Sequence, residues 1–248
     1  PWLDSFIFNQ LGALYDPRYR RFEFNDDLNE EEVKIYLGTY FPRSYAESFL
    51  IFDNILSNEK YRLLVTARNE LTIFSIGSGT GGDIIGLLAS IDKYIPQNIP
   101  VSILSLDVNT YALSVQMHII ERYERITDRR IRISQFKERI QGPDTLKKYA
   151  DNSGMVDFLL FSKIGCELHA KNILKDSNIY TELLTAFKGK ISPVGMTALI
   201  DVTTKADGIE HMPIILNRGV ASFIKANPDY ATLLPLSCNE YENKCTIP

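Results

Sequence analysis

The chain has 248 residues, a formal net charge of −4 at pH 7, and hydrophobic residues at 45% of its positions. This length suits one large α/β domain with a helical extension. The near-average charged content of 23% argues against a disordered or fibrous chain. No apolar run reaches the roughly 18 to 20 residues that cross a bilayer, so we expect a soluble protein that does not engage membranes.

Cysteine usage predicts a reducing compartment and hence a cytoplasmic protein. Cys166, Cys238 and Cys245 are too few, and odd in number, for a disulfide framework. Cys238 and Cys245 raise the question of a metal site completed beyond Pro248. Two thiols at this spacing are a weak signal, and the histidines show no ligand spacing, so no metal site is predicted. The chain starts at Pro1 and ends within a plausible element, which suggests a fragment.

Residues 1–70 are predicted to form a helical cap. Glutamates at positions 30–32 lie where the first turn of a helix favours negative charge, and apolar residues follow at helical spacing. A second helix is predicted over residues 45–56, with Pro42 at its start. Residues 71–248 are predicted to form the second unit, a cofactor-binding domain truncated at its C-terminal end.

From residue 71 onward, short apolar runs alternate with longer helical stretches. Strands are predicted over residues 71–76, 101–106, 131–136, 156–161 and 196–202. Helices are predicted through about residue 91 and over 112–123, 172–187 and 212–225. The continuous apolar run at 156–161 is typical of a strand buried on both faces. The alternation predicts an α/β fold with a doubly wound, mostly parallel sheet.

The most informative segment leads from the first strand into Gly77-Ser-Gly79-Thr-Gly81-Gly82 and then into a helix. Glycines allow a tight turn and let a ligand approach the backbone closely. The spacing differs from G-x-G-x-x-G, and no Lys-Ser/Thr pair follows as in a P-loop. We interpret the segment as a nucleotide-type binding loop, and a tight turn without a ligand is the structural alternative.

Asp107 ends the second predicted strand, where neighbouring loops of a doubly wound sheet meet. A carboxylate at this point can accept both hydroxyls of a ribose. The structural alternative is a helix N-cap, which is a common use of aspartate. Because strand, glycine loop and terminal acid agree, ribose binding is the preferred interpretation.

These features resemble the class I S-adenosylmethionine-dependent methyltransferases. The resemblance covers residues 71–202 and rests on the glycine loop, on Leu106-Asp107-Val108, on the strand at 156–161, and on the turn from Ile191 into Leu199-Ile-Asp201. It implies S-adenosylmethionine as methyl donor and S-adenosylhomocysteine as product. By this resemblance the cofactor residues are Gly77, Ser78, Gly79 and Gly81 at the methionine part, Asp107 at the ribose, Val108 against the adenine, Gln135 and Phe136 at the adenine edge, and Ser162 and Lys163 facing the methyl donor.

The chain departs from that family two positions before the first glycine, where Ser75 stands in place of a frequent acid. Asp83 is the residue that can compensate, and a helix N-terminal acid is the alternative. In many class I enzymes, N-terminal helices cover the cofactor. Arg43 would then pair with the cofactor carboxylate, and Tyr40 or Tyr45 would close over the sulfonium. Aromatic packing in the core is the alternative for these tyrosines.

Catalytic candidates follow the fourth predicted strand. The segment lacks Asn/Asp-Pro-Pro-Tyr/Phe and contains Glu167 and His169 instead. Either residue would position or deprotonate a methyl acceptor, with loop packing or helix capping as the alternative. Methyl transfer from a sulfonium is an in-line displacement, for which alignment and desolvation suffice without a strong base.

The acidic charge and the aromatic cap favour a small-molecule or peptide acceptor. An RNA-directed methyltransferase or a ribosome assembly factor is the first alternative and needs a local basic surface. The candidates for it are Arg129, Arg130, Arg132, Lys147 and Lys148. Acids interleave with the arginines, so that segment is interpreted as a solvated helix face. A non-catalytic binding protein is the second alternative, mildly favoured by Ser75.

Overall fold

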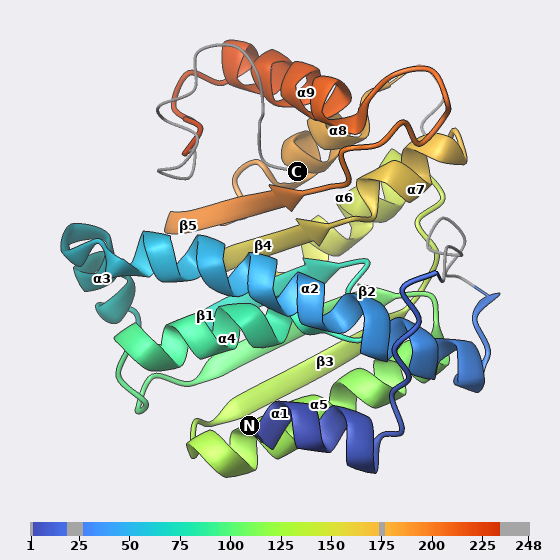
Figure 1. The fold of residues 1–248 in the computed structure, drawn as a ribbon. Coiled ribbons are helices and arrows are strands. Elements are labelled where there is room, and N and C mark those ends of the chain that lie inside the picture. The colour runs from blue at the N-terminus through green and yellow to red at the C-terminus, as the bar shows by residue number, and fades with distance from the viewer. Residues whose placement is uncertain (1, 19–26, 174–176, 234–248) are drawn as a thin grey trace.

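The computed structural model describes residues 2–18, 27–173 and 177–233. Its centre is a five-stranded, all-parallel sheet in the order β3-β2-β1-β4-β5 (Figure 1). The strands are β1 (Leu71–Ile76), β2 (Val101–Asp107), β3 (Ile131–Lys137), β4 (Val156–Ser162) and β5 (Ile191–Ile200). The predicted doubly wound parallel sheet is therefore confirmed.

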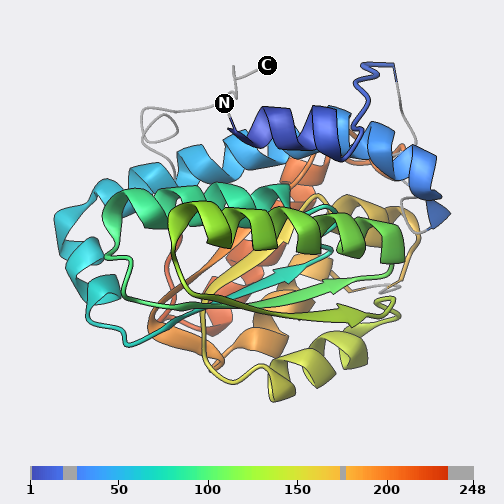
Figure 2. The same ribbon diagram turned by 90° about the horizontal axis from the view of Figure 1, so that it is seen from below.

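Helices cover both faces of the sheet (Figure 2). One face carries α2 (Glu30–Ser57), α4 (Gly82–Tyr94) and α5 (Thr110–Thr127), and the other carries α6 (Pro143–Asn152), α8 (Ile179–Phe187) and α9 (Met212–Ala226). Shorter elements are α1 (Trp2–Asp4), the π-helical η1 (Ser5–Gln10), α3 (Glu59–Thr66) and α7 (Gly165–Ala170). Each face has its own hydrophobic cluster, as expected when helices shield both sides of a parallel sheet.

The burial of the strands explains why apolar runs in the sequence predicted them. In β4, which lies between β1 and β5, every residue except the last is buried. In β3, at the edge of the sheet, only Ile131 is buried, and the other positions are half-buried or exposed. The sequence pattern therefore distinguishes a central strand from an edge strand.

Residues 30–57 form one helix, where two were predicted. Asn29 caps it: its Oδ1 accepts the Glu32 backbone N–H at 3.0 Å, and the Glu32 carboxylate accepts the Asn29 N–H at 3.1 Å. Pro42 lies inside the helix and removes one backbone hydrogen bond, a change that costs about 3 kcal/mol in a helix interior. The helix continues because its packing outweighs this local cost.

Close packing of α2 on α4 provides that compensation. A Cβ atom on Gly86 would lie 2.4 Å from the Tyr45 carbonyl oxygen, so the glycine lets the two helix backbones meet. At the same crossing the Ser48 hydroxyl donates to the Asp83 carbonyl at 2.7 Å. Helix α2 therefore packs as part of the hydrophobic core on this face of the sheet.

The segments between strands differ from prediction in three further places. The helix α6 was not predicted, because it is short and polar. The predicted helix at 172–187 is confirmed only from Ile179 onward as α8, and the short α7 lies before the predicted range. Helix α8 begins where the Asn178 side chain accepts the N–H groups of Tyr180 and Thr181. Strand β5 starts at Ile191, earlier than predicted, with an irregularity opposite the start of β4.

Within the described ranges, no helix combines the length and the apolar character that crossing a membrane requires. The described residues also contain no group of three or more histidine, cysteine or acidic side chains arranged to hold a metal ion. Cys238 and Cys245 lie outside the described residues.

Candidate functional site

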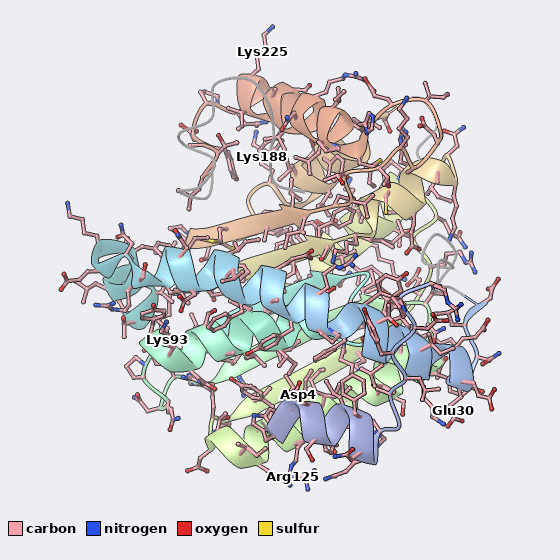
Figure 3. All side chains as sticks on the ribbon, viewed as in Figure 1. Asp4, Glu30, Lys93, Arg125, Lys188 and Lys225 are labelled. Carbon is pink, nitrogen blue, oxygen red and sulfur yellow. The ribbon has the colours of Figure 1, made fainter. Side chains whose placement is uncertain are left out.

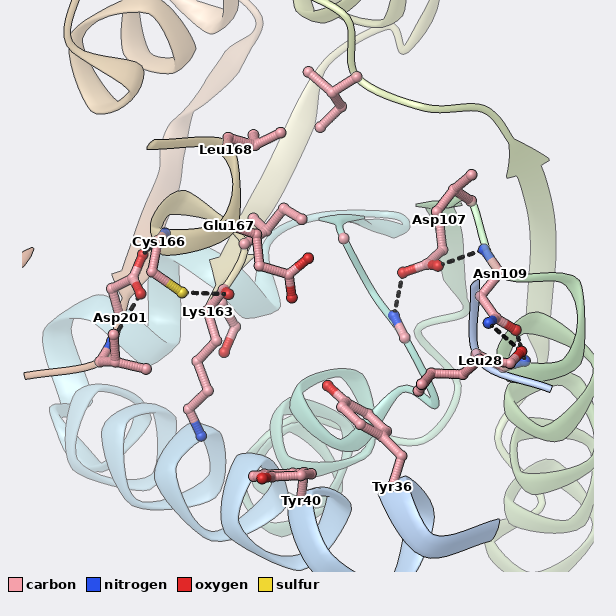
Figure 4. Close-up of a pocket in the computed structure, with 18 of the residues that line it drawn as sticks. Leu28, Tyr36, Tyr40, Asp107, Asn109, Lys163, Cys166, Glu167, Leu168 and Asp201 are labelled. Atoms are coloured by element: carbon pink, nitrogen blue, oxygen red, sulfur yellow. Dashed lines mark hydrogen bonds between the residues drawn. The ribbon is translucent and has the colours of Figure 1, made fainter. Parts of the chain in front are cut away.

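The carboxyl ends of the strands open into a cavity of about 820 Å³ (Figure 4). The strand order reverses between β1 and β4, and ligands of open α/β sheets bind at such a switch point. Loops after all five strands line the cavity, and α2 closes the opposite side. The residues that α2 contributes are Val33, Tyr36, Thr39, Tyr40, Arg43 and Glu47.

The glycine loop between β1 and α4 is held against the end of β2. Gly77, Gly79 and Gly81 have φ values of 67°, 49° and 82°, a region that side chains with a Cβ rarely adopt. The Gly79 N–H donates to Oδ2 of Asp107 at 2.7 Å. This bond fixes the loop beside the carboxylate that the sequence singled out.

Asp107 is half-buried, lines the cavity and does not cap the next helix. Its Oδ1 accepts the Asn109 N–H at 2.8 Å. The cap of α5 is Asn109, whose side chain accepts the Ala112 N–H at 3.0 Å and donates to the Leu28 carbonyl at 2.9 Å. The alternative interpretation of Asp107 as an N-cap is therefore wrong. Because each carboxylate oxygen accepts more than one hydrogen bond, Asp107 can also meet ligand hydroxyls.

Glu167 is the acidic side chain of α7 that points into the cavity (Figure 4). The residue is 7% exposed, and its Oε2 lies 4.0 Å from the Lys171 Nζ. The start of α7 is anchored by Asp201, which accepts the Cys166 N–H at 3.0 Å and the Tyr180 hydroxyl at 2.6 Å. Burial raises the pKa of Asp201. Asp201 follows β5 and lines the same cavity.

Lys163 follows β4 in a strained backbone conformation. Its φ of 60° is uncommon for a residue with a side chain, and such strain clusters at functional sites. The side chain runs toward α2, where its Nζ lies 2.5 Å from a carboxylate oxygen of Glu47. The Lys163 N–H donates to the Ile200 carbonyl at 2.7 Å, so the strained residue is held between two strands.

The structure brings together most of the predicted site residues. Those that line the large cavity are Gly77, Gly79, Asp107, Val108, Ser162, Lys163, Arg43 and Glu167. Ser78 belongs to the loop but its side chain is buried, and its hydroxyl lies 2.7 Å from that of Ser105. Gly81 is the N-cap residue of α4.

Four other predicted residues do not line the cavity. One is His169, whose Nε2 lies 3.0 Å from a carboxylate oxygen of Asp207. Tyr45 stacks on Phe49, with ring centroids 6.0 Å apart, on the side of α2 that packs against the core. Neither is placed where it would contact a ligand in the cavity.

Gln135 and Phe136 are the other two, and they miss the cavity because β3 extends further than predicted. The Gln135 amide donates to the Leu113 carbonyl at 2.7 Å, and Phe136 packs on Tyr149 with ring centroids 5.3 Å apart. The residues after β3 that do line the cavity are Glu138, Arg139 and Ile140.

Tyr36 and Tyr40 cover the cavity from α2, with ring centroids 5.1 Å apart (Figure 4). Burial raises the pKa of the Tyr36 phenol, and the nearby carboxylates of Glu167, Asp107 and Asp83 raise it further. The sequence predicted Tyr40 or Tyr45 as the cofactor contact, and of these two only Tyr40 lines the cavity. Tyr36 and Tyr40 are about one helical turn apart, which was the signal for a shared face.

The candidate basic surface is largely taken up by internal contacts. Arg129 is fully buried: its guanidinium pairs with Asp92 and donates to the carbonyls of Pro96, Ile99 and Ile95. The interpretation of this arginine as part of a solvated helix face is therefore wrong.

Two further members of the candidate set are in ion pairs. Arg132 pairs with Glu70, and the Lys148 ammonium lies 2.5 Å from Glu138. By contrast, Arg125 in the last turn of α5 is exposed at the outer surface (Figure 3).

Neither a scan of protein-family models nor a search of curated proteins finds a match. Among solved structures, the chain is similar to the plantazolicin methyltransferase BpumL, solved with a monoazolic desmethylPZN analogue and SAH. The two are 14% identical, with a TM-score of 0.47, and the alignment covers 92% of this chain and 75% of that one.

Two other solved structures illustrate the range of similar proteins. One is CalS11, the TDP-rhamnose 3'-O-methyltransferase of calicheamicin biosynthesis, which is 14% identical with a TM-score of 0.45 over 95% of this chain and 87% of that one. The other is an rRNA-methylase candidate from Clostridium thermocellum, 14% identical with a TM-score of 0.43 over 70% of this chain and 80% of that one. At this identity a likeness concerns the fold, and what those proteins bind or methylate belongs to them.

Proposed function

We propose that this chain binds S-adenosylmethionine at the carboxyl edge of its sheet and transfers the methyl group to a small-molecule or peptide acceptor. The observation that carries the proposal is the pairing of the glycine loop with Asp107, whose carboxylate accepts the Gly79 N–H at 2.7 Å beside the cavity. A glycine loop and a strand-end acid in this arrangement suit a nucleoside ligand.

The cavity fits such a ligand together with an acceptor. Its volume of about 820 Å³ lies within the range of roughly 300–1,000 Å³ typical of small-molecule sites. Leu28, Val108, Ala112 and Ile140 supply apolar lining near Asp107, which suits an adenine ring. The other end, toward Lys163 and Glu167, then holds the reacting groups.

When bound, S-adenosylmethionine supplies a methyl group on a positively charged sulfur that is open to in-line displacement. Tyr36 and Tyr40 would favour that positive charge through their ring faces and help to exclude water. Glu167 would accept the proton that an acceptor loses and orient the acceptor. The main role of the chain in this arrangement is to align the two ligands. Alignment removes a large part of the barrier to a displacement between them.

The proposal is tested by methyl transfer from labelled S-adenosylmethionine to a panel of amines, phenols, carboxylic acids and short peptides. We expect saturable binding of the cofactor, and transfer to at least one acceptor class. Replacing Glu167 with Gln should slow transfer by about 10²-fold or more while leaving the Kd for S-adenosylhomocysteine unchanged. A folded protein that binds neither S-adenosylmethionine nor S-adenosylhomocysteine would refute the proposal.

A parallel measurement separates this acceptor class from RNA. Because Arg129 is buried and Arg132 and Lys148 are in ion pairs, RNA binding at low salt should be weak. Tight, strongly salt-dependent RNA binding would instead favour an RNA acceptor.

A further inference from the structure

Glu167 brings a carboxylate into an apolar part of the large cavity. Its side chain extends from α7 into the cavity, and the residue is 7% exposed (Figure 4). Ile164, Leu168 and Ile173, from the same stretch of chain, also line the cavity. Charge interactions are stronger where apolar groups displace water. A ligand group that meets this carboxylate is therefore selected by its charge.

The space in front of Glu167 is bordered by a second carboxylate and by an aromatic side chain. Asp107 faces this space from the end of β2, and the Tyr36 hydroxyl points toward it from α2 (Figure 4). Burial raises the pKa of the Tyr36 phenol, and the Glu167 carboxylate raises it further, ahead of those of Asp107 and Asp83. The potential at this point is therefore negative, which favours cationic groups.

The basic side chains described at this end of the cavity offer an anion less. The Lys163 Nζ lies 2.5 Å from a Glu47 carboxylate oxygen, so an anionic ligand would compete with Glu47 for it. The Lys171 Nζ lies 4.0 Å from the Glu167 Oε2, which exceeds a direct hydrogen bond. Arg43 also lines the cavity, but it is exposed, where water and salt screen its charge. An ammonium group can approach Glu167 more closely than Lys171 does.

Other acceptor classes match these charges less well. A carboxylic acid reaches the site as an anion, which the charge of Glu167 repels. An aliphatic alcohol is neutral and has to lose its proton as it attacks, and a carboxylate is a weak base for that purpose. An amine arrives as a cation, and loss of one proton gives it a nucleophilic lone pair.

We propose that the methyl acceptor is an amine and that Glu167 selects it by binding its ammonium form. This inference rests on the proposed function and names the acceptor class. Glu167 takes one proton from the ammonium and passes it to water. The amine nitrogen then bonds to the methyl carbon with its lone pair, and the electron pair of the broken S–C bond stays on sulfur. The products are the methylated ammonium, S-adenosylhomocysteine and one released proton.

The first test measures methyl transfer from labelled S-adenosylmethionine to two sets of acceptors that differ only in the reacting group. One set is phenethylamine, phenethyl alcohol and hydrocinnamic acid, and the other is hexylamine, hexanol and heptanoic acid. We expect the amine to have the highest kcat/KM of its set, by about 10-fold or more, as for a hydrogen bond to a charged group. This comparison uses the wild-type protein and does not depend on the folding of a variant.

Two variants separate recognition by Glu167 from the intrinsic reactivity of amines. Glu167→Gln keeps the shape and removes the charge, so the KM for the amine should rise by about 10-fold or more. Lys171→Met removes the base that shares Glu167, so the same KM should fall by about 2- to 5-fold, as for a partly solvated ion pair. For an anionic acceptor, Lys171→Met would raise the KM instead. Calorimetric titration of phenethylamine into protein saturated with S-adenosylhomocysteine should give the same order of affinities.

Glu121→Gln is the matched control, because Glu121 is an exposed acid of α5 outside the cavity lining. It should leave the KM for the amine unchanged. Preference for an alcohol or an acid, an amine KM that Glu167→Gln does not raise, or cofactor binding without a methylated amine in either set would overturn the inference. A wild-type protein that binds no S-adenosylhomocysteine would instead refute the proposed function, on which the inference depends.

Discussion

The two edges of the sheet both bury charged groups, but they use them differently. At the amino edge, the Arg129 guanidinium pairs with Asp92 and three backbone carbonyls. There too, Asp157 accepts the Ser192 hydroxyl at 2.6 Å and the Thr72 N–H at 2.9 Å. These charges are met by the protein's own groups, and they tie neighbouring strands and loops together.

At the carboxyl edge, charged groups line open space instead. Asp107, Lys163 and Glu167 face the large cavity, Asp83 borders a small recess, and Lys163 has a strained backbone. Such an arrangement lowers stability unless a ligand compensates it. Under the proposed function, charges at the amino edge serve stability and those at the carboxyl edge serve binding.

The largest loss of stability is expected from removing a buried charge at the amino edge of the sheet. Arg129→Ala would remove the guanidinium from the partly buried Asp92, which keeps the Tyr123 hydroxyl as a donor, and from three backbone carbonyl oxygens. Removing one member of a buried ion pair costs about 3–5 kcal/mol, and we expect a loss of this size in urea unfolding. The neighbouring Arg130 is exposed, so Arg130→Ala should change stability by less than about 0.5 kcal/mol. Equal effects of the two substitutions would remove the contrast between buried and exposed arginines.

A smaller effect, with a distinct pH dependence, is expected at the carboxyl edge. The pKa of Asp83 is raised by burial from 3.8 to about 6, so its ionisation lowers the stability of the fold progressively between these pH values and by a constant amount above them. Asp83→Asn should therefore melt at a higher temperature than wild type at pH 7.5, and the gap should shrink toward pH 4.

Asp207 provides a control for this experiment, because its contribution to stability changes with pH in the opposite direction. Hydrogen bonds from the Ile209 and Glu210 backbone N–H groups and from His169 lower its pKa to about 2. The stability that Asp207 contributes is present at neutral pH and is lost as pH falls from 3.8 toward 2. A melting temperature of Asp83→Asn below that of wild type at pH 7.5 would contradict the view that this carboxylate is a cost to stability.

The smallest stability effect separates backbone strain from ligand contact. Gly79 and Gly154 have φ values of 49° and 69°, and only Gly79 lies at the cavity. Alanine at either position should cost about 1–2 kcal/mol, because both backbones are in the left-handed region. Only Gly79→Ala should also weaken S-adenosylhomocysteine binding, as measured by calorimetry. Equal affinity in the two variants would show that the loop does not approach the ligand.

Much of the fold could be predicted because its signals are local. Apolar runs identified all five strands, and the run of glycines after β1 identified the loop. The helical cap was harder, because Pro42 is a strong local signal for a helix start and only the packing of α2 on α4 overrides it. Local propensity cannot anticipate a contact between segments that are distant in the sequence.

The site was predictable where strand ends define it and less so elsewhere. Asp107, Lys163 and Glu167 follow strands and line the cavity as the topology requires. Tyr36 and Tyr45 are nine positions apart in one helix, which is about two and a half turns. They therefore lie on opposite faces, and the sequence alone did not show which face meets the cavity.

The central claim is that the carboxyl edge binds a nucleoside through Asp107. It is tested most directly by titrating S-adenosylhomocysteine into the wild-type protein and into Asp107→Ala, with both proteins shown to be folded. We predict one saturable site in the wild type and a loss of about 10²-fold in the variant, as expected for two hydrogen bonds to a charged group. No binding to the wild type, or the same affinity in both proteins, would contradict the account.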